Sequence, residues 1–583
     1  IKRKLKPDKL TINNGSIIQF QYKNICLFDI CKHLTGSLKD NLKSFDCKIL
    51  KGDFNHDDPR LLGGWENMPE ELKQSCLKYL EADVMGLKEL YQKLNDGVYE
   101  KHKVNITEYI STSSLTFNLW KETFINNQEL MKLETSKPID FINLPTLEQE
   151  KLFRQAVRGG RTYKSKHRFK STQYESFLKG DCNFDTIDDY LIDADGVSLY
   201  PTAMTKYPYP VGECKELLPH QNYMMGVLGI YYIKYITNKN LQHSIGGRRA
   251  EDGSLKWDLK DGEGVYTSIA IEDMIANGYK IEIISGYYWE KMEYIFKEFI
   301  EDLFIQKQNS EKGTVQYSLA KLFMNALYGK MIQRPINDKT EIISSNAEYW
   351  KFWGKHIIKN VEKVGETWAI TGTPKELLLQ EKCITKPTHL GAFILDYSRR
   401  IMLNFIKQSN PYFDSPDISK RIENDFYYTD TDSLQMHRRN AELLKNMGSD
   451  DLGGIQDDLK GGKIIRGIWV APKLYMLEYV KKGDTNLHYH FRGKGLNTDN
   501  LTVKSFEEMD AGRSLINIRD FQFKKVHIKR DSKQITAGIP QFSIVHYSKS
   551  AESDLSRLSK TVNSKLWDGR DFINGGNDSK PWV

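Results

Sequence analysis

The sequence predicts a multidomain α/β (α+β) protein, and three observations lead to this prediction. The chain has 583 residues, which at roughly 100–200 residues per domain gives about three to five domains or subdomains. A hydrophobic fraction of 39% is enough for sizeable cores. Amphipathic segments with helical spacing alternate with strand-like runs along the chain, so helices and strands are both expected.

Helical periodicity marks several segments. In 69–94, for example, the apolar positions 72, 76, 80, 84, 87 and 90 recur every three or four residues. Helices are predicted at 69–94, 115–132, 292–307, 314–332 and 389–409. Strands are predicted at 188–195, repeatedly within 205–290, as a hairpin at 424–437 and as one strand at 469–480. Residues 335–385 are polar, and we expect an irregular insertion there.

Composition excludes several classes of protein. No apolar run approaches the ~18 residues that span a bilayer, and no secretory signal is visible, so no membrane partner is expected. The seven cysteines form no Cys-x-x-Cys pair, which argues against a zinc site or a disulfide framework and favours an intracellular, reducing setting. The net charge of +7 bears on partners and not on the fold.

Positive charge is concentrated in residues 151–170, KLFRQAVRGGRTYKSKHRFK, which hold eight Lys or Arg and no acid. Such a run is commonly a solvated loop. Here a Gly-Gly pair, 159–160, lies within it, and aromatic residues are interleaved. Glycines let backbone N–H groups approach an anion, and basic side chains neutralise phosphates. We therefore favour a nucleic-acid contact in this segment.

Two aspartates, Asp430 and Asp432, occur in the segment YYTDTDSLQM. Side chains alternate along a strand, so these carboxylates can lie on one side of a tight hairpin, where they repel each other unless a cation lies between them. A polar turn is the alternative, because Asp and Thr are common turn residues. The apolar flanks favour buried acids and hence a divalent metal.

A third acid lies in LIDADGVSLYPTAM, where a strand ends at Asp195 and a short helix begins near Ser198. An ordinary strand-to-helix turn with a capping acid is the alternative. Asp193, on the same strand face, is the rival ligand. We prefer Asp195, because the turn places it at the strand end, where ligands usually bind.

The segment KLFMNALYGK places Lys321, Asn325 and Tyr328 on one helix face. This face could simply be solvated. It could also bind a nucleotide, with Lys321 at the triphosphate and Tyr328 near the base. Lys307, on the preceding helix, could reach the same phosphates. Carboxylates that hold two divalent ions and lysines that neutralise a triphosphate are what nucleotidyl transfer requires.

These motifs identify a family by resemblance. DGVSLYP, KLFMNALYG, YTDTDS and KLY resemble, in this order, motifs A, B, C and Lys-x-Tyr of the family B DNA polymerases. The chain looks most like the protein-primed branch of podoviruses and linear plasmids. VRGGRTY resembles that branch's Tyr-x-Gly-Gly segment, with Val157 in place of the Tyr. The resemblance implies a right-hand polymerase of palm, fingers and thumb, preceded by a partial RNase H-like 3′–5′ exonuclease domain.

The implied domain order divides the chain into seven segments. They are 1–150, partial exonuclease domain and connector; 151–204, first part of the palm; 205–290, first insertion, contacting terminal protein and DNA; 291–334, fingers; 335–385, second insertion, for processivity and strand displacement; 386–482, second part of the palm; and 483–583, thumb and C-terminal tail.

The resemblance also implies the roles of individual residues. Asp195 and Asp432 would be the principal ligands of two Mg²⁺ ions, or of Mn²⁺, with Asp430 assisting, and all three count as catalytic. Tyr200 would exclude a ribose 2′-OH. The incoming dNTP would contact Tyr200, Lys307, Lys321, Asn325 and Tyr328. DNA would contact Arg158, Gly159, Gly160, Ser198, Gly329, Thr429, Lys473 and Tyr475, the last two at the primer end. Ala326 stands where the family often has Ser.

An exonuclease remnant is implied by Lys51, Tyr79 and Asp83, which resemble the auxiliary lysine and the Tyr-x-x-x-Asp motif of the family's proofreading domain. Without the family, Tyr79 and Asp83 would be assigned to a plain amphipathic helix. The other exonuclease acids should lie upstream and are not in this chain. We expect the sequence to be a fragment, or its proofreading site to be incomplete.

The resulting hypothesis is a DNA-directed DNA polymerase that starts on a terminal-protein hydroxyl and replicates a linear plasmid or viral genome. Its expected partners are template and primer DNA, dNTPs and a terminal protein, and we expect a monomer. Its expected location is a mitochondrion or the cytoplasm of a virus-infected host. The alternatives are a 3′–5′ exonuclease and a non-catalytic DNA-binding relic.

Overall fold

The computed structural model describes residues 8–551 except for 14–15, 35, 53, 56–57, 59, 62–64, 136–141, 219–220, 251–252, 335–337, 365–366, 376–385, 494–500, 512–514 and 521–545. The chain forms two compact units. Unit 1 comprises residues 1–147 and 294–387, with the short segment 536–539, and unit 2 comprises 148–293, 388–535 and 540–583. The changes between units fall within a few residues of the segment boundaries at 150, 290 and 385 expected from the sequence.

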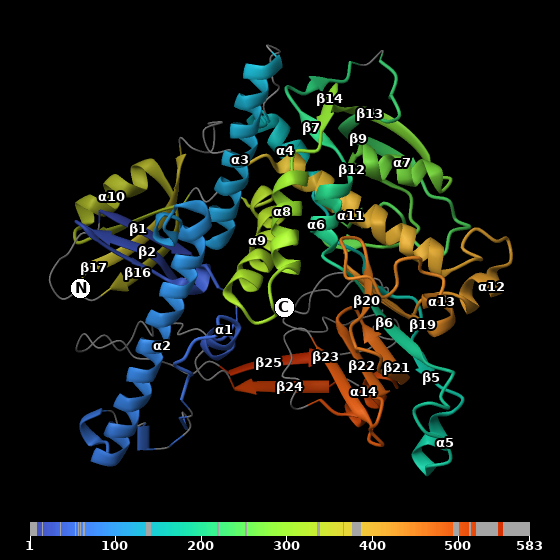
Figure 1. The fold of residues 1–583 in the computed structure, drawn as a ribbon. Helices are drawn as coiled ribbons and strands as arrows, with labels where there is room; N and C mark the ends of the chain where they lie inside the picture. Colours follow the sequence, from blue (N-terminus) through green and yellow to red (C-terminus); the bar gives the residue numbers. More distant parts are fainter. Residues whose placement is uncertain are drawn as a thin grey trace. The chain divides into compact units, whose positions relative to one another are not determined.

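Unit 1 begins with an antiparallel sheet, β1-β2-β3, followed by three helices (Figure 1). The bounds are β1 Lys9–Asn13, β2 Ser16–Tyr22, β3 Ile25–Phe28, α1 Leu38–Ser44, α2 Glu70–His102 and α3 Thr112–Thr135. The helix predicted at 69–94 is confirmed, and it extends beyond residue 94 to His102. It stops where Lys103 adopts a left-handed φ of 56°.

Two helices, α8 Lys297–Gln308 and α9 Val315–Met331, form a hairpin in unit 1. Helix α9 packs against α2, α3 and α8. Its buried side carries Leu319, Phe323 and Leu327. Thr314 caps its N-terminus by accepting a hydrogen bond from the Tyr317 N–H, which satisfies one of the donors that a helix start leaves open.

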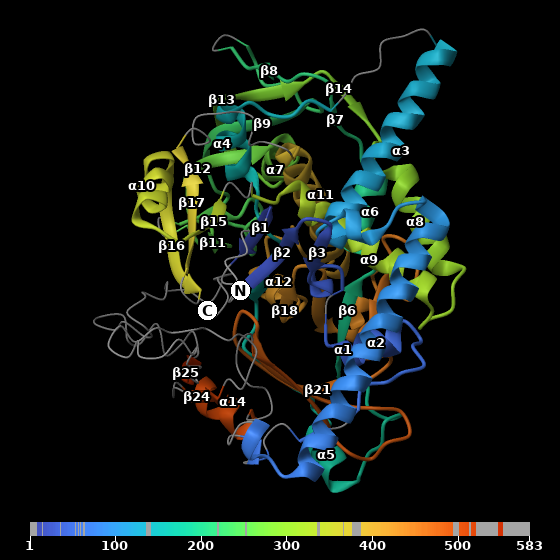
Figure 2. The same cartoon turned by 90° about the vertical axis from the view of Figure 1, so that its left-hand side faces the viewer.

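The second insertion is more regular than we expected from its polar sequence. Its described residues form the sheet β15-β17-β16 with helix α10 beside it (Figure 2). The bounds are β15 Lys339–Ile343, α10 Asn346–Lys355, β16 His356–Val364 and β17 Thr367–Pro374. The small core of Ile343, Phe352 and Ile370 lies between helix and sheet. Strand β1 also contacts β15. The sheet of the insertion is therefore supported by a neighbouring strand as well as by its small apolar core.

Unit 2 is built on a nine-stranded sheet with the main order β23-β22-β21-β6-β19-β18-β4, with β20 paired to β6 and β5 to β21. The strands are β4 Thr162–Lys164, β5 Arg168–Lys170, β6 Leu191–Gly196, β18 Tyr428–Asp430, β19 Ser433–His437, β20 Ile455–Asp457, β21 Lys463–Ala471, β22 Leu474–Val480 and β23 His488–Gly493. The single strand predicted at 469–480 is wrong: the chain turns at 472–473, between β21 and β22.

Helices and a second sheet complete unit 2. The helices are α4 Leu147–Ala156, α5 Tyr174–Lys179, α6 Leu199–Lys206, α7 Ser268–Ala276, α11 Thr388–Ser409, α12 Ile418–Glu423, α13 Arg438–Ala441 and α14 Val503–Asp510. The first insertion forms the sheet β12-β9-β13-β8, with β8 Lys215–Glu216, β9 Leu228–Ile236, β12 Gly262–Thr267 and β13 Lys280–Trp289. The apolar helix α11 packs against both α6 and α7 (Figure 1).

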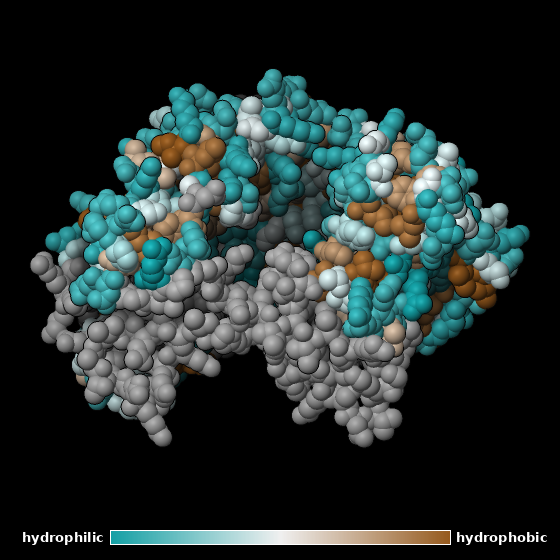
Figure 3. Space-filling view, turned by 90° about the horizontal axis from the view of Figure 1, so that it is seen from below, coloured by the Kyte–Doolittle hydropathy of each residue, from teal (hydrophilic) through white to brown (hydrophobic). Residues whose placement is uncertain are grey.

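Short strand pairs join the remaining segments. They are β7 Tyr209–Val211 with β14 Lys291–Glu293, β10 Arg248–Arg249 with β11 Leu255–Lys256, and β24 Leu515–Asp520 with β25 His546–Ala551. Most of the expected thumb and tail lies outside the described residues. On the coloured part of the face shown in Figure 3, hydrophilic residues predominate and hydrophobic residues form separate patches. Within the described part of the chain, no helix combines the length and apolarity that crossing a membrane needs.

Candidate active site

The three predicted aspartates lie at neighbouring strand ends in unit 2. Asp195, near the end of β6, pairs in register with Ser433 at the start of β19. The Gly196 N–H donates to the Asp432 carbonyl oxygen at 2.7 Å, which fixes the two strand ends against each other. Asp430, the last residue of β18, pairs with Thr162 on β4.

Three residues in these motifs have a left-handed backbone. They are Ser198, Thr431 and Lys473, with φ of 50°, 67° and 59°. This conformation is unusual for side chains other than Gly, Asn and Asp, and most of all for β-branched Thr, so the surrounding structure must stabilise it. Each of the three occupies the tight turn that follows a strand end of the site. Because all three left-handed residues lie in turns of the same site, we infer that tertiary contacts stabilise these turns.

Burial and mutual repulsion act on Asp195 and Asp432. Burial, with the charges of Asp432 and Asp458, raises the pKa of Asp195 to about 7. Burial also raises the pKa of Asp432, with Asp430 and Asp458 acting in the same direction. A carboxylate that is charged under these conditions is stabilised by a bound cation.

The rival ligand, Asp193, is engaged inside the sheet. It is buried, its Oδ2 accepts a hydrogen bond from the Gln435 amide at 2.9 Å, and burial raises its pKa to about 7. Asp195 has no such hydrogen bond among the described contacts. The Asp193 carboxylate is thus used inside the sheet, and the preference for Asp195 as the ligand stays a prediction.

Asp430 differs from the other two because its charge is already compensated. Its carboxylate lies 2.6 and 2.8 Å from Lys473 Nζ, and it accepts a hydrogen bond from the Thr162 hydroxyl at 3.0 Å. In the described residues, no three of His, Cys, Asp or Glu are gathered closely enough to hold a metal ion. The expected three-aspartate ligand set is therefore not assembled here.

A divalent ion nevertheless fits the two remaining acids. Asp195 and Asp432 supply the carboxylate oxygens that Mg²⁺ prefers, and both have a raised pKa that a nearby cation would reverse. Family B DNA polymerases use divalent metal ions. The residues that would hold one here are thus Asp195 and Asp432, with Asp430 available only if Lys473 releases it.

The Gly-Gly segment supports the turn at Thr431. The Thr431 N–H donates to the Arg161 carbonyl oxygen at 2.7 Å. A Cβ on Gly160 would lie 2.8 Å from Thr431 Cα, whereas a Cβ on Gly159 would meet nothing within 4 Å. Gly160 is therefore required for close backbone approach, and the backbone at Gly159 is open.

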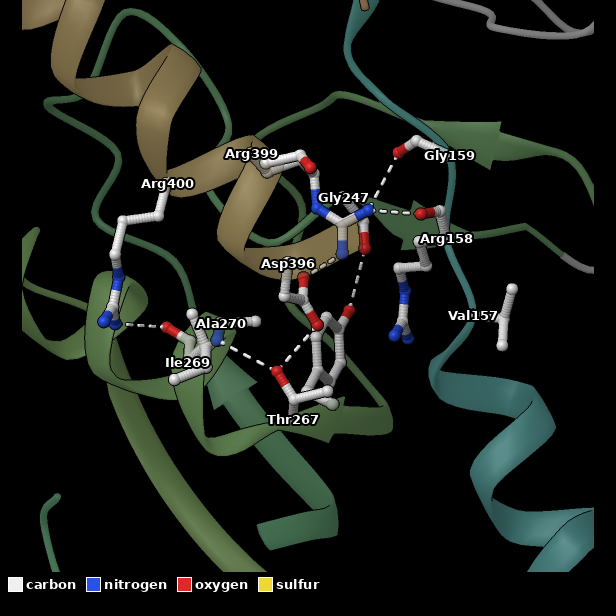
Figure 4. A network of polar contacts seen from close by, with 12 residues as sticks. Val157, Arg158, Gly159, Gly247, Thr267, Ile269, Ala270, Asp396, Arg399 and Arg400 are labelled. Carbon is white, nitrogen blue, oxygen red and sulfur yellow. Dashed lines mark hydrogen bonds and ion pairs between the residues drawn. The ribbon is translucent and has the colours of Figure 1, made fainter. Parts of the chain in front are cut away.

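A buried polar network holds this segment in place (Figure 4). The Arg399 guanidinium on α11 donates to the carbonyl oxygens of Arg158 and Gly159, and it forms an ion pair with Asp396 one turn earlier. The Asp396 carboxylate also accepts the Thr267 hydroxyl at 2.7 Å. The network ties α11 and the first insertion to the backbone just before Gly160.

Three cations of the basic run 151–170 are buried inside the protein, while the nucleic-acid contact expected of the run as a whole stays a prediction. The Arg158 guanidinium is stacked 3.7 Å from the Tyr266 ring and donates to the Val265 carbonyl oxygen. Arg161 donates to the Arg399 carbonyl oxygen, and Lys164 donates to two carbonyl oxygens near Trp469. The buried side chains Arg158, Arg161 and Lys164 are at most 6% exposed. These cations satisfy backbone oxygens and are not presented to phosphates.

Two further expected DNA contacts are also buried. Thr429 is 1% exposed and donates its hydroxyl hydrogen to the Ser433 carbonyl oxygen, closing the hairpin. Tyr475 is 8% exposed and packs against the rings of Tyr428 and His490. These side chains belong to the core of the sheet, because the strands that carry them are covered on the faces where they point. Their assignment to DNA stays a prediction.

The predicted nucleotide-binding residues of the helical hairpin lie in unit 1. Lys321, Asn325 and Gly329 are exposed on one face of α9, opposite its buried face, and Tyr328 is half-buried beside them. Lys307 lies near the end of α8, 5.3 Å from the Phe304 ring. Lys321, Asn325 and Tyr328 therefore share one face of α9, as their spacing predicts. Tyr200 is in unit 2, half-buried in the first turn of α6.

The expected exonuclease remnant is gathered in unit 1. Lys51 Nζ lies 5.5 Å from the Tyr79 ring centroid and 4.0 Å from Asp83 Oδ2. A hydrogen bond with Tyr79 is the main cause of the raised pKa of Lys51. Asp83 Oδ1 is buried without a hydrogen-bond partner among the described residues. The three residues from two distant segments thus form one group.

Several residues of the site were not found from the sequence. Thr162 and Asp458 carry no local signal, since only the sheet brings them to the aspartates. Asp396 and Arg399 did offer one: an acid and an arginine three residues apart in an otherwise apolar helix favour a buried ion pair.

Comparisons with known proteins agree with this geometry. A family model described as DNA polymerase type B, organellar and viral, matches residues 64–411, more than half of the chain. A probable DNA polymerase of Podospora anserina is 24% identical over 467 residues, covering 75% of this chain and 35% of that protein. One of Agaricus bitorquis is 25% identical over 578 residues, covering 87% and 66%. The chain therefore spans between about one third and two thirds of the length of these relatives.

A solved structure shows the same fold. Phi29 DNA polymerase, complexed with primer-template DNA and incoming nucleotide substrates, superposes with a TM-score of 0.60 at 18% identity. The match covers 92% of this chain and 83% of that one. The fold is thus the right-hand arrangement expected from the motifs, joined to a domain of the exonuclease type.

Proposed function

Because this chain belongs to the type B DNA polymerases of organelles and viruses, we propose that it is a DNA-directed DNA polymerase that adds dNTPs to a primer 3′-OH along a DNA template. One observation carries the proposal. Asp195 and Asp432 are two carboxylates at adjoining strand ends, and burial together with neighbouring acids raises the pKa of both. Such a pair is costly for folding and suits a cation-dependent transfer.

The residues act by position and charge. Two Mg²⁺ ions, replaceable by Mn²⁺, would be held by Asp195 and Asp432 and would stabilise charge on the attacking and leaving oxygens. Lys321 and Lys307 neutralise the incoming triphosphate, Asn325 orients it, and Tyr328 lies against the nascent pair. Tyr200 excludes a ribose 2′-OH, so the substrate is a deoxynucleotide.

Primer extension with Mg²⁺ and dNTPs tests the proposal. Asp432→Asn should reduce incorporation by about 1,000-fold or more, as expected when charge stabilisation of the transition state is removed, and should leave affinity for primer-template within about twofold. The control is Asp450→Asn, an exposed aspartate of the same unit, which should extend primers normally. Normal extension by Asp432→Asn would disprove the assignment. Binding without incorporation by the unaltered chain would instead support a non-catalytic DNA-binding protein.

A 3′–5′ exonuclease is a second candidate, favoured by the grouping of Lys51, Tyr79 and Asp83. We propose that this group contributes to proofreading only together with further acids. Degradation of a labelled primer without dNTPs should therefore be weak in this chain. Strong degradation, lost in Asp83→Asn, would show that the group is sufficient.

The remaining proposals concern initiation and setting. We propose that the polymerase starts on a hydroxyl of a terminal protein, acts as a monomer, and replicates a linear plasmid in mitochondria or a viral genome in the host cytoplasm. Transfer of labelled dNMP to a protein, visible after denaturing electrophoresis, tests the mode of initiation.

A further inference from the structure

A short loop of the first insertion, residues 242–245, packs against the segment that leads into the hairpin β18–β19. The loop lies between β9 and β10 in the chain, and its residues His243 and Ile245 are at most 5% exposed. The Ile245 N–H donates to the Tyr279 hydroxyl oxygen at 3.3 Å, which attaches the loop to the rest of the insertion. Loops are rarely buried, because their polar groups then need partners inside the protein. This loop finds such partners at both ends of the hairpin.

The first end is the base of the hairpin, where Asp425 lies just before β18 and is 1% exposed. Its Oδ1 lies 2.9 Å from His243 Nε2, and its Oδ2 accepts hydrogen bonds from the Gln242 amide at 2.6 Å and from the Ser165 hydroxyl. A carboxylate can only accept, so His243 Nε2 carries the hydrogen of this contact. The His243 ring also stacks on Phe426, with centroids 4.8 Å apart. The loop therefore fixes both a charged and an aromatic side chain at the base.

The second end is the turn of the hairpin. Arg161 connects the loop to it, because its guanidinium donates to the Ile245 carbonyl oxygen at 3.0 Å while its own carbonyl oxygen accepts the Thr431 N–H at 2.7 Å. Thr431 stands between Asp430 and Asp432 and has a left-handed backbone. A residue in this conformation depends on its surroundings to hold it there. Base and turn are thus both connected to four consecutive residues of the insertion.

We propose that His243 is a positioning residue of the polymerase, which acts through Asp425 on the hairpin and so on the carboxylates of Asp430 and Asp432. The proposal rests on the proposed polymerase function and gives the first insertion a role within the palm. Acids that are held in place before the reaction need no rearrangement during it, and a misplacement of about 1 Å costs up to about 100-fold in rate. A histidine that only filled the core would contribute to stability and not to the rate.

Single-turnover incorporation of one dNTP by the full chain separates these two roles. The amplitude of the reaction reports the folded, active fraction, whereas its rate constant reports the geometry of the site. His243→Ala should lower the rate constant about tenfold or more and should leave the dissociation constants for dNTP and primer-template within about twofold. His243→Gln, whose amide can donate to Asp425 in place of Nε2, should restore most of the rate constant. The control is His488→Ala, which removes a 2.7 Å contact with Asp484 in the same unit and should leave the rate constant unchanged.

A lower amplitude with an unchanged rate constant in His243→Ala would show a purely structural role and overturn the proposal. A rate constant for His243→Gln as low as that of His243→Ala would also overturn it, because the donated hydrogen bond would then not be the cause. Gln242→Ala removes another donor to the same carboxylate and serves if His243→Ala does not fold. It should lower the rate constant about threefold, as expected for one hydrogen bond, and no change would contradict the proposal.

The proposed polymerase function fails in a different way. If the unaltered chain does not extend a primer, the polymerase function itself is wrong. If the unaltered chain and His243→Ala extend it with equal rate constants, the polymerase function stands and the positioning role is wrong.

Discussion

Lys473 Nζ lies 2.6 Å from Oδ1 and 2.8 Å from Oδ2 of Asp430, so the two residues form a close and partly buried ion pair. The Lys473 N–H also donates to the Tyr428 hydroxyl oxygen at 2.8 Å. The left-handed turn between β21 and β22 is therefore bound to the hairpin that carries Asp430. This pair explains why the three aspartates of the site are not equivalent: one is neutralised by the protein, whereas two are not.

A double-mutant cycle measures this ion pair. Lys473→Met and Asp430→Asn should each destabilise the chain, and the double variant should be less destabilised than the sum. The expected coupling is about 1–2 kcal/mol, as for charge-assisted hydrogen bonds shielded from water. Urea unfolding provides the free energies. Lys420→Met with Asp417→Asn, an exposed pair 3.9 Å apart, is the control and should couple by less than about 0.5 kcal/mol. Equal coupling energies in the two cycles would contradict the interpretation that shielding from water strengthens the Lys473–Asp430 pair.

The two glycines of the Gly-Gly segment should respond differently to substitution. Gly160→Ala brings a methyl group to 2.8 Å from Thr431 Cα, so the turn between Asp430 and Asp432 must shift. Such a shift of the turn should lower the rate of nucleotide incorporation about 100-fold. Gly159→Ala has open space and should retain nearly full activity. Single-turnover incorporation checks both. Similar rates for the two variants would show that the close approach does not position the turn.

The network around Arg399 should contribute strongly to stability. Asp396→Asn removes the carboxylate beside a buried arginine, and breaking a buried pair from one side costs about 3–5 kcal/mol. Asp417→Asn removes an exposed partner of Lys420 and should cost less than about 1 kcal/mol. Urea unfolding monitored by circular dichroism checks the difference. A loss below about 1 kcal/mol for Asp396→Asn would indicate that Arg399 does not depend on this carboxylate.

Asp195 should destabilise the fold when no cation is bound. Burial and the nearby acids raise its pKa from 3.8 to about 7, so the folded state disfavours the charged form. The cost is absent below about pH 4, grows between pH 4 and 7, and is complete above pH 7. In chelator at pH 8, Asp195→Asn should therefore raise Tm by roughly 2 °C or more, and the gain should vanish near pH 4.

The control for that measurement is Asp261→Asn. The pKa of Asp261 is held at about 2, mainly by the Lys239 side chain, so its charged form is favoured in the folded state. This substitution should not raise Tm at any pH. A lower Tm for Asp195→Asn at pH 8 would contradict the assignment of a raised pKa to Asp195.

Much of the fold could be read from the spacing of apolar residues. The buried helix α11, the hairpin β18–β19 and the exposed face of Lys321 and Asn325 follow directly from local periodicity. Local pattern failed where a turn carries no glycine. The turn at Lys473 is an example, because its φ of 59° is imposed by bonds to Tyr428 and Asp430 and not by its own preference.

The basic segment 151–170 shows that local sequence pattern also limits the prediction of function. Eight cations without an acid in 151–170 indicate a phosphate contact when only charge is considered. In the fold, Arg158, Arg161 and Lys164 point inward and donate to backbone carbonyl oxygens of distant segments. The sequence records the charge of a side chain. It does not record which buried backbone oxygens the fold brings within reach, and that decides where the side chain points.

The sequence by itself determined the family, the order of the motifs and the identity of Asp195 and Asp432 as the candidate ligands, because these depend on residue types at fixed local spacing. Only the tertiary structure decided that Asp430 is paired with Lys473 and that Gly160 supports Thr431. Each of these depends on segments far apart in the chain. Their proximity is set by strand pairing and helix packing, whose outcome is not encoded in any one segment.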